Sequence, residues 1–208
     1  MNIHLALLSR QTIRDFAPKK INKSIIEKLI KAGFAAPSNN HMREWHFVLL
    51  QDMAKRKELL DKVIKPTGVK GATAIIDRWG LKDPLQRGCY IEAIPKQYSM
   101  LFRAPLLILP FFRQPYPLLK PKSLSDLNYF ASIWACIENI LVAAAAEGLF
   151  GVTRIPFSDE SKTVKKYLNI PADYEFPAWI ALGYPAEGAK RVKQVEIKLS
   201  ERIHLNTW

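Results

Sequence analysis

The stretch Ser9-Arg10-Gln11-Thr12-Ile13-Arg14-Asp15-Phe16 places two arginines four residues apart with a threonine hydroxyl between them. A guanidinium group presents its N–H donors in a planar fork that matches the oxygens of a phosphate, and a hydroxyl adds a further donor. The stretch therefore predicts a site for a phosphorylated ligand. From these residues alone, an exposed helix face with loose ion pairs to an acid such as Asp15 is an equally good interpretation.

The whole chain has 208 residues, 49% of them hydrophobic, and a formal net charge of +12. That length and composition are typical of one compact domain, or of one protomer of an intertwined oligomer. The charge suits nucleic acid, an acidic membrane surface or a phosphorylated ligand. The basic residues are spread along the chain without zinc-finger spacing or an aromatic RNA-binding signature, so we expect no nucleic-acid partner.

Cys89 and Cys136 are the two cysteines, and neither belongs to a CxxC pattern. The sequence therefore predicts neither a disulfide framework nor a metal site, and Cys89 is expected to be an inert thiol. The first eight residues lack the charged start and cleavage site of a secretory signal. We expect a cytoplasmic protein whose N-terminus is part of the fold.

Local signals predict most of the regular elements. Ser24 and Glu27 form a capping-box pattern for a helix that runs to about Ala35, before Pro37. Residues 45–50 predict a strand, and Asp52 caps a helix that runs to about residue 64. The other expected elements are a strand over 104–110, a long apolar helix closed by the glycines of 148–151, a helix over 158–168 and a strand over 176–183. We expect one domain over 1–208, in which about 66–100 form a mobile excursion that covers a pocket.

The apolar run from Tyr129 to Val152 is long enough to cross a bilayer. Glu138, Asn139 and Glu147 interrupt it, and a charge near the middle of a membrane span costs several kcal/mol. An all-round apolar helix is also typical of a large soluble core or a dimer interface. We therefore expect a buried helix and no membrane partner.

The sequence contains four histidines and no GxSxG, HExxH or Walker motif. Familiar hydrolase chemistry is therefore not predicted, and a chain that performs chemistry without such side chains usually uses a cofactor. The run 148–151 is not a dinucleotide fingerprint, because it follows a helix and not a strand. Trp45 and Trp179 are expected in the core. For four other aromatic residues we prefer the core over the alternative of pocket lining, namely Trp79, Tyr90, Tyr98 and Phe102.

The order of motifs along the chain resembles that of the FMN-dependent nitroreductase family. The shared features are Arg-x-Thr-x-Arg at 10–14, Ala-Pro-Ser-Asn-Asn at 36–40, Trp-x-Phe at 45–47, a glycine turn, Leu-Gly-Tyr-Pro at 182–185 and His-x-Asn-x-Trp at 204–208. The resemblance covers nearly the full length and is weak between 66 and 128. It implies an α+β fold, with a central mixed or antiparallel sheet flanked by helices. It also implies an intertwined homodimer with two FMN sites at its interface, where each C-terminal tail adds to the other subunit.

The resemblance implies a role for several residues. Arg10 faces the FMN phosphate, and Arg14 reaches the ribityl and pyrimidine side. The loop of residues 37–39 approaches the flavin from the second subunit, and Gly151 lies by the ring edge near N5. The candidate cofactor-binding residues are thus Arg10, Gln11, Thr12, Arg14, Pro37, Ser38, Asn39, His41, Gly151, Lys193 and Lys198, and no metal ligand is expected.

Two departures from the family pattern affect the site. Where the family commonly has Asn-x-Gln-Pro-Trp, residues 41–45 read His-Met-Arg-Glu-Trp, so His41 and Arg43 are candidate substrate residues. In the tail, Glu196 falls where the family often has a phosphate-binding arginine. We expect Lys193, Lys198 or Arg191 to replace that arginine with a small shift in register.

The resemblance implies an enzyme that takes a hydride from NADH or NADPH through flavin N5. The hydride then passes to an electron-poor small-molecule acceptor such as a nitroaromatic or a quinone. Arg14 is the candidate for stabilising charge near N1 and O2 of the flavin, and no side chain is a certain catalytic residue. The alternatives are a flavin-binding sensor or carrier with little turnover, and a basic nucleic-acid binder without a chromophore.

Overall fold

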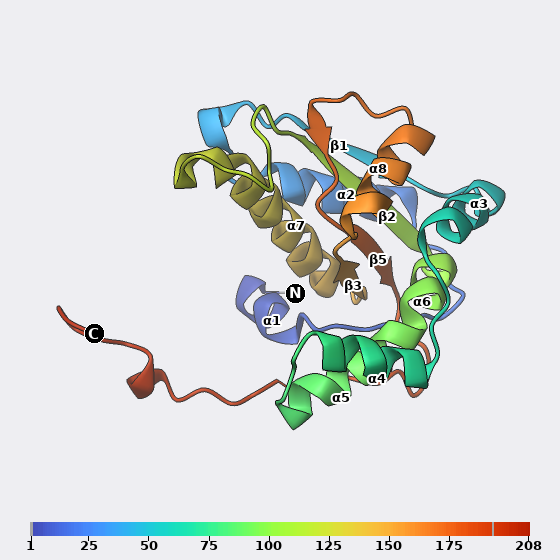
Figure 1. Cartoon of the computed structure of the whole chain (residues 1–208). Coiled ribbons are helices and arrows are strands. Elements are labelled where there is room, and N and C mark those ends of the chain that lie inside the picture. The colour runs from blue at the N-terminus through green and yellow to red at the C-terminus, as the bar shows by residue number, and fades with distance from the viewer. Residues whose placement is uncertain (1, 193) are drawn as a thin grey trace.

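A computed structural model of the chain describes residues 2–192 and 194–208. Its centre is an antiparallel sheet with strand order β1-β2-β5-β3, and β4 pairs with the end of β2 (Figure 1). The strands are β1 Trp45–Leu49, β2 Leu106–Arg113, β3 Phe150–Arg154, β4 Tyr174–Glu175 and β5 Trp179–Gly183. The predicted α+β class, with a central sheet flanked by helices, is confirmed.

The helices surround this sheet. They are α1 Ile3–Ser9, α2 Lys23–Phe34, α3 Met53–Val63, α4 Val69–Arg78, α5 Pro84–Ala93, α6 Gln97–Arg103, α7 Asn128–Ala146 and α8 Ser158–Tyr167. Four short 3₁₀ segments complete the described structure: η1 Asn39–His41, η2 Ile94–Lys96, η3 Leu124–Leu127 and η4 Leu199–Glu201. In Figure 1, α4, α5 and α6 group at one end of the molecule, and the C-terminal tail runs away from the body beyond α5.

The central strand β2 is buried on both faces, which explains its nearly unbroken apolar sequence. Successive side chains of a strand point to opposite faces. Leu106, Ile108 and Phe112 pack into a core with α2 and α7. Leu107, Leu109 and Phe111 pack into a second core with α3, α6 and α8. The sheet therefore lies between two helical layers.

The apolar helix α7 is the main element of the first layer. A Cβ on Gly33 of α2 would lie 2.9 Å from Ile140 and 3.0 Å from Cys136, so the glycine permits close packing of α2 on α7. Among the described residues, one helical stretch, Leu124–Ala146, is long and apolar enough to cross a membrane, by length and composition only. Of its most apolar part, 39% is buried in the protomer. Most of the remaining residues of α7 are partly buried, so its own chain covers this helix incompletely.

Two local expectations were wrong at the level of single elements. Asn22, not Ser24, is the N-cap of α2, and no side chain caps that helix end. Strand β2 continues through Pro110 instead of ending there. Pro110 lies opposite Phe47 of β1, between the part of β2 that pairs with β5 and the part that pairs with β4. A residue without an N–H is tolerated where one side of the strand has no partner.

The glycine run and the 66–100 segment also differ from expectation. Gly148 has φ +72° and ends α7, but Gly151 lies in the unpredicted strand β3, opposite Leu182 of β5. A Cβ on Gly151 would lie 1.9 Å from the Ala181 oxygen, so the residue permits close approach of two strands and does not end a helix. Residues 66–100, for which the sequence predicts no regular element, contain α4, α5 and most of α6.

Candidate functional site

The segment between α1 and α2 lies along the edge strand β3. Thr12 forms a parallel bridge with Gly151, and the Ile13 amide donates a hydrogen bond to the Gly151 carbonyl at 3.1 Å. Ile13 is buried. Because an extended segment alternates its side chains, burying Ile13 directs Thr12 and Arg14 to the opposite side. The local pairing thus brings Thr12, Arg14 and Gly151 close together.

A cavity of about 660 Å³ opens on that side. Its volume is within the usual range for a small-molecule or cofactor site. One wall is α5, a helix without any buried residue, and the other wall is β3 with the arginine segment. The lining residues are Thr12, Arg14, Asp83, Leu85, Gln86, Cys89, Tyr90, Ala93, Val152, Thr153 and Val195.

Among the lining residues, Arg14 has a buried hydrogen-bond donor that no described residue satisfies. Its Nε atom is buried and has no hydrogen-bond partner among the described residues. Burial lowers the pKa of the Arg14 guanidinium from its ordinary value, and the nearby Glu92, Cys89 and Asp15 oppose that shift. A buried donor without a partner costs about 1 to 3 kcal/mol. The site therefore fits a ligand that presents a hydrogen-bond acceptor, preferably with negative charge, to Arg14.

Arg10, in contrast to Arg14, already has an ion-pair partner. Its Nε lies 2.9 Å from Oε1 of Glu138 on α7, in a half-exposed ion pair. Arg10, Gln11, Thr12 and Gly151 line a small cavity of about 40 Å³ beside the larger one. The alternative interpretation named Asp15 as a partner, but Asp15 pairs with Lys96 at 2.6 Å.

The loop between α2 and β1 is held in an unusual backbone conformation. Asn40, His41 and Arg43 have φ values of 56°, 57° and 49°, which non-glycine residues rarely adopt. Each such residue costs about 1 to 2 kcal/mol, so neighbouring groups must hold the loop. We call residues 38–44 the strained loop.

Hydrogen bonds from α7 hold the N-terminal half of the strained loop. The Asn39 amide donates to the Ser132 hydroxyl at 3.0 Å, and the Asn40 side-chain amide donates to the Tyr129 hydroxyl at 3.3 Å. Within the loop, the Arg43 amide donates to the Ser38 hydroxyl at 3.2 Å.

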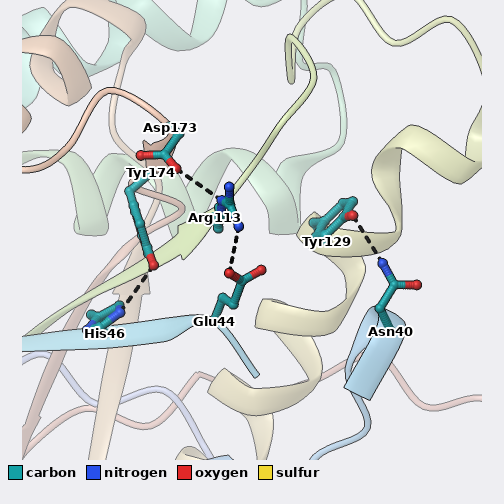
Figure 2. Close-up of polar contacts among 7 residues, drawn as sticks. All are labelled: Asn40, Glu44, His46, Arg113, Tyr129, Asp173 and Tyr174. Carbon is teal, nitrogen blue, oxygen red and sulfur yellow. Dashed lines mark hydrogen bonds and ion pairs between the residues drawn. The ribbon is translucent and has the colours of Figure 1, made fainter. Parts of the chain in front are cut away.

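Arg113, the last residue of β2, holds the C-terminal end of the strained loop. Its Nη1 donates to Glu44 at 2.8 Å and its Nε to Asp173 at 3.0 Å (Figure 2). Its backbone amide also donates to the Glu44 carbonyl at 3.1 Å. The hydrogen bond and charge of Glu44, followed by those of Asp173, raise the pKa of Arg113. We call Arg113, Glu44 and Asp173 the Arg113 clamp.

The two parts of the predicted site contact different stretches of α7. Arg10 pairs with Glu138, whereas the strained loop bonds to Tyr129 and Ser132. Along the helix, Glu138 lies six positions from Ser132 and nine from Tyr129, which corresponds to roughly 9 to 14 Å. None of the predicted loop residues, Pro37, Ser38, Asn39, His41 and Arg43, lines the cavity of Arg14.

The C-terminal tail begins beside the cavity and then leaves it. Lys190 pairs with Glu92 of α5 at 2.7 Å, and Val195 lines the cavity. Lys198 lies farther along, exposed, and pairs with Glu201 at 3.3 Å. Lys193 lies outside the described residues. Neither Arg191 nor Lys198 lines the cavity of Arg14.

The expectations about aromatic residues are partly confirmed. Trp45 and Trp179 are buried, and Tyr98 and Phe102 pack against the core. The core prediction was wrong for Trp79 and Tyr90, which are 43% and 38% exposed and contact each other edge to face. Tyr90 is a cavity wall residue, because α5 stands against the site instead of in a core.

Sequence reasoning missed three groups of this site. Glu138 was considered only as an interruption of an apolar run, Arg113 was not considered, and the wall formed by α5 was not predicted. A signal for α5 was present: Asp83 accepts a hydrogen bond as N-cap, and Pro84 occupies the first turn. Arg113 and Glu138 had no comparable local signal.

Comparison with known proteins places this geometry in a family. The model of the Nitroreductase family matches residues 7–184. An iodotyrosine deiodinase of Nematostella vectensis is 25% identical over 189 residues, covering 89% of this chain and 67% of the deiodinase. A protein of Archaeoglobus fulgidus with the provisional name NADH dehydrogenase/NAD(P)H nitroreductase is 23% identical over 204 residues, covering 97% and 96%.

Solved structures show the same fold. The crystal structure of an oxidized iodotyrosine deiodinase bound to FMN and 3-iodo-L-tyrosine superposes with a TM-score of 0.75 at 18% identity, and the match covers 100% of both chains.

Proposed function

Because this chain belongs to the nitroreductase family, we propose that it is an FMN-dependent oxidoreductase that uses NADH or NADPH to reduce an electron-poor acceptor. The observation that carries the proposal is the buried Nε of Arg14, which has no hydrogen-bond partner among the described residues and lies at the wall of a cavity of about 660 Å³. The provisional name of the Archaeoglobus relative supports the choice of reductant. When bound, FMN accepts a hydride at N5 and donates it to the acceptor.

The residues of this chain would hold and tune the cofactor. Arg14 would donate its free N–H to the pyrimidine side and stabilise negative charge there, which is the usual contribution of a fixed donor in a protected site. Arg10 and Thr12 would supply a guanidinium and a hydroxyl to the phosphate. Gly151 would place the backbone of β3 by the ring edge, and α5 would limit access of water from the other wall.

We propose that the working form is a homodimer in which each site uses both subunits. The strained loop of the same chain does not line the cavity of Arg14, so a loop of the second subunit would complete the site. Two surfaces are available for such an interface, the part of α7 that is not buried and the exposed apolar side chains of the tail. The exposed tail side chains are Val195, Ile197, Leu199, Ile203, Leu205 and Trp208. Lys193 and Lys198 remain the candidates for a tail contact to the phosphate.

The acceptor class is best tested with the purified protein. Its absorbance spectrum should show flavin, and anaerobic NADH or NADPH should bleach that absorbance. A nitroaromatic or a quinone should then restore it. A yellow protein that does not bleach would support a flavin carrier with little turnover, and a colourless one that does not bind added FMN would refute the proposal.

The acceptor preference should depend on the strained loop. Replacing His41 with Asn and Arg43 with Gln should change the ratio of nitroaromatic to quinone rates while the protein stays folded, because loop side chains contribute little to packing. Unchanged ratios with FMN fully bound would exclude these two residues from the acceptor site.

A second candidate reaction is reductive removal of iodide from an iodinated phenol. The similarity to the Nematostella deiodinase favours it, as does the fold shared with the deiodinase bound to 3-iodo-L-tyrosine. Adding 3-iodo-L-tyrosine to the reduced protein and measuring released iodide separates this reaction from reduction of nitroaromatics.

We propose a cytoplasmic location, with no membrane and no nucleic-acid partner.

A further inference from the structure

The strained loop has three residues in the left-handed region, and its hydrogen bonds to α7 reach only Asn39 and Asn40. Arg43 is the least suited of the three, since Asn and His are more often found with positive φ. On the C-terminal side of Arg43, the loop is held at Glu44 by the side chain of Arg113.

The clamp joins the loop to two strands. Arg113 is the last residue of β2, Asp173 directly precedes β4, and Glu44 directly precedes β1. Figure 2 shows the guanidinium between the two carboxylates, each of which it meets with a different nitrogen. Since the Arg113 amide also bonds to the Glu44 carbonyl, one residue holds Glu44 by both its backbone and its side chain.

We propose that Arg113 is a positioning residue for the cofactor site. Through Glu44 it holds the strained loop in the conformation that reaches the FMN of the partner subunit. This inference rests on the proposed function, because it is FMN that gives the loop its role. Arg113 lines neither the cavity of Arg14 nor the small cavity of Arg10, so it acts through the loop.

In the competing interpretation, the Arg113 clamp only fastens β4 to the sheet. The two interpretations differ in whether the bond of Arg113 to Glu44 or its bond to Asp173 is essential. If Arg113 positions the loop, its bond to Glu44 is essential and its bond to Asp173 is secondary. If it fastens β4, the bond to Asp173 is essential.

The test compares Arg113→Gln, Glu44→Gln, their double variant and the control Asp173→Asn, each as the full chain. Hydrogen exchange of peptides over 38–47 reports on the loop without FMN, and a peptide over β5 serves as the internal reference. FMN titration by fluorescence quenching reports on the site. Circular dichroism and thermal melts confirm that every variant is folded.

We expect Arg113→Gln to accelerate exchange over 38–47 at least fivefold and to weaken FMN binding about fivefold, equivalent to about 1 kcal/mol. Exchange of β5 should not change. Glu44→Gln should reproduce both effects, and the double variant should be no worse than either single one, because the two residues act through one contact. Asp173→Asn should change both quantities less than twofold.

Two results would overturn this inference alone. One is an Asp173→Asn effect on loop exchange and FMN affinity as large as that of Arg113→Gln. The other is an Arg113→Gln variant with unchanged exchange over 38–47 or unchanged FMN affinity. If the unmutated protein did not bind FMN, the proposed function and this inference would both fail, so the two failures can be distinguished.

Discussion

Replacing Arg14 with methionine should weaken FMN binding without destabilising the FMN-free protein. In most proteins, removing a buried arginine destabilises the fold, because its partner is left behind without a counter-charge. Arg14 has no hydrogen-bond partner among the described residues, and its Nε is buried. Methionine retains most of the apolar stem and removes the unsatisfied donor.

The magnitude follows from two opposing contributions in the FMN-free protein. Removing an unsatisfied buried donor should relieve about 1 to 3 kcal/mol. Removing the attraction of Glu92 and Asp15 at longer range should cost about 1 kcal/mol. The free energy of unfolding should therefore stay the same or rise by up to about 2 kcal/mol.

FMN binding should change in the opposite sense. A hydrogen bond that involves a charged group contributes about 1.5 to 3 kcal/mol, so Arg14→Met should weaken binding roughly tenfold to 150-fold. The assays are urea unfolding of the FMN-free protein and FMN titration by fluorescence quenching.

Arg154 of β3 provides a matched control. It forms a two-pronged ion pair with Glu160 at 2.6 Å for each contact, and the two side chains are 7% and 10% exposed. Breaking a buried pair of this kind costs about 3 to 5 kcal/mol, so Arg154→Met should lower the free energy of unfolding by that amount. The reasoning would be refuted if Arg14→Met destabilised the FMN-free protein by about 2 kcal/mol or more while FMN affinity stayed unchanged.

Three further predictions concern the arginine pair, the tail and a buried thiol. Arg10→Ala should weaken FMN binding roughly thirty-fold to a thousand-fold while circular dichroism stays unchanged, because a charge-assisted phosphate contact contributes about 2 to 4 kcal/mol and an exposed ion pair at most about 1 kcal/mol. Light scattering should give twice 23.8 kDa, and deleting residues 199–208 should reduce both this mass and FMN retention. Burial raises the pKa of Cys136 to about 12, so the folded state keeps this proton while the unfolded thiol loses it near pH 8.5 to 9. Stability should therefore fall above that pH by up to about 1.4 kcal/mol per unit, and urea unfolding of Cys136→Ala should show a shallower fall.

Elements with a complete local signal were predictable. Asp52 caps α3 through hydrogen bonds from the amides of Ala54 and Lys55, which is what the sequence pattern indicates. Strand β3 was not predicted, because the glycines of 148–151 were both interpreted as the end of the helix, whereas only Gly148 ends α7 and Gly151 belongs to the strand. Among the described residues, β3 pairs with strand β5, which lies about thirty residues downstream, so long-range pairing rather than local preference makes it a strand.

Within 66–100, helix α4 could have been predicted, because its apolar residues recur at helical spacing and Ala72 and Ile76 are buried. Helix α5 has no buried residue, so its sequence carries no such signal for a core-facing side. Long-range contacts of the site were not predictable either. The four-residue spacing of Arg10 and Arg14 predicts an anion site, but Glu138 lies 128 positions from Arg10, and only the fold brings them together. That the Nε of Arg14 has no hydrogen-bond partner among the described residues is likewise a property of the folded chain.

The different states of the two arginines determine how a phosphorylated cofactor would enter the site. A ligand contact to the Nε of Arg14 breaks no existing hydrogen bond, since this atom has no partner among the described residues. A contact to Arg10 competes with Glu138, whose side chain is 52% exposed and whose ion pair contributes at most about 1 kcal/mol. A phosphate brings more charge than one carboxylate and should win that competition. Glu138→Gln should therefore leave FMN affinity equal to or tighter than that of the unmutated protein. If Glu138→Gln instead weakened binding as much as Arg10→Ala, Glu138 would be orienting the guanidinium toward the phosphate rather than competing for it.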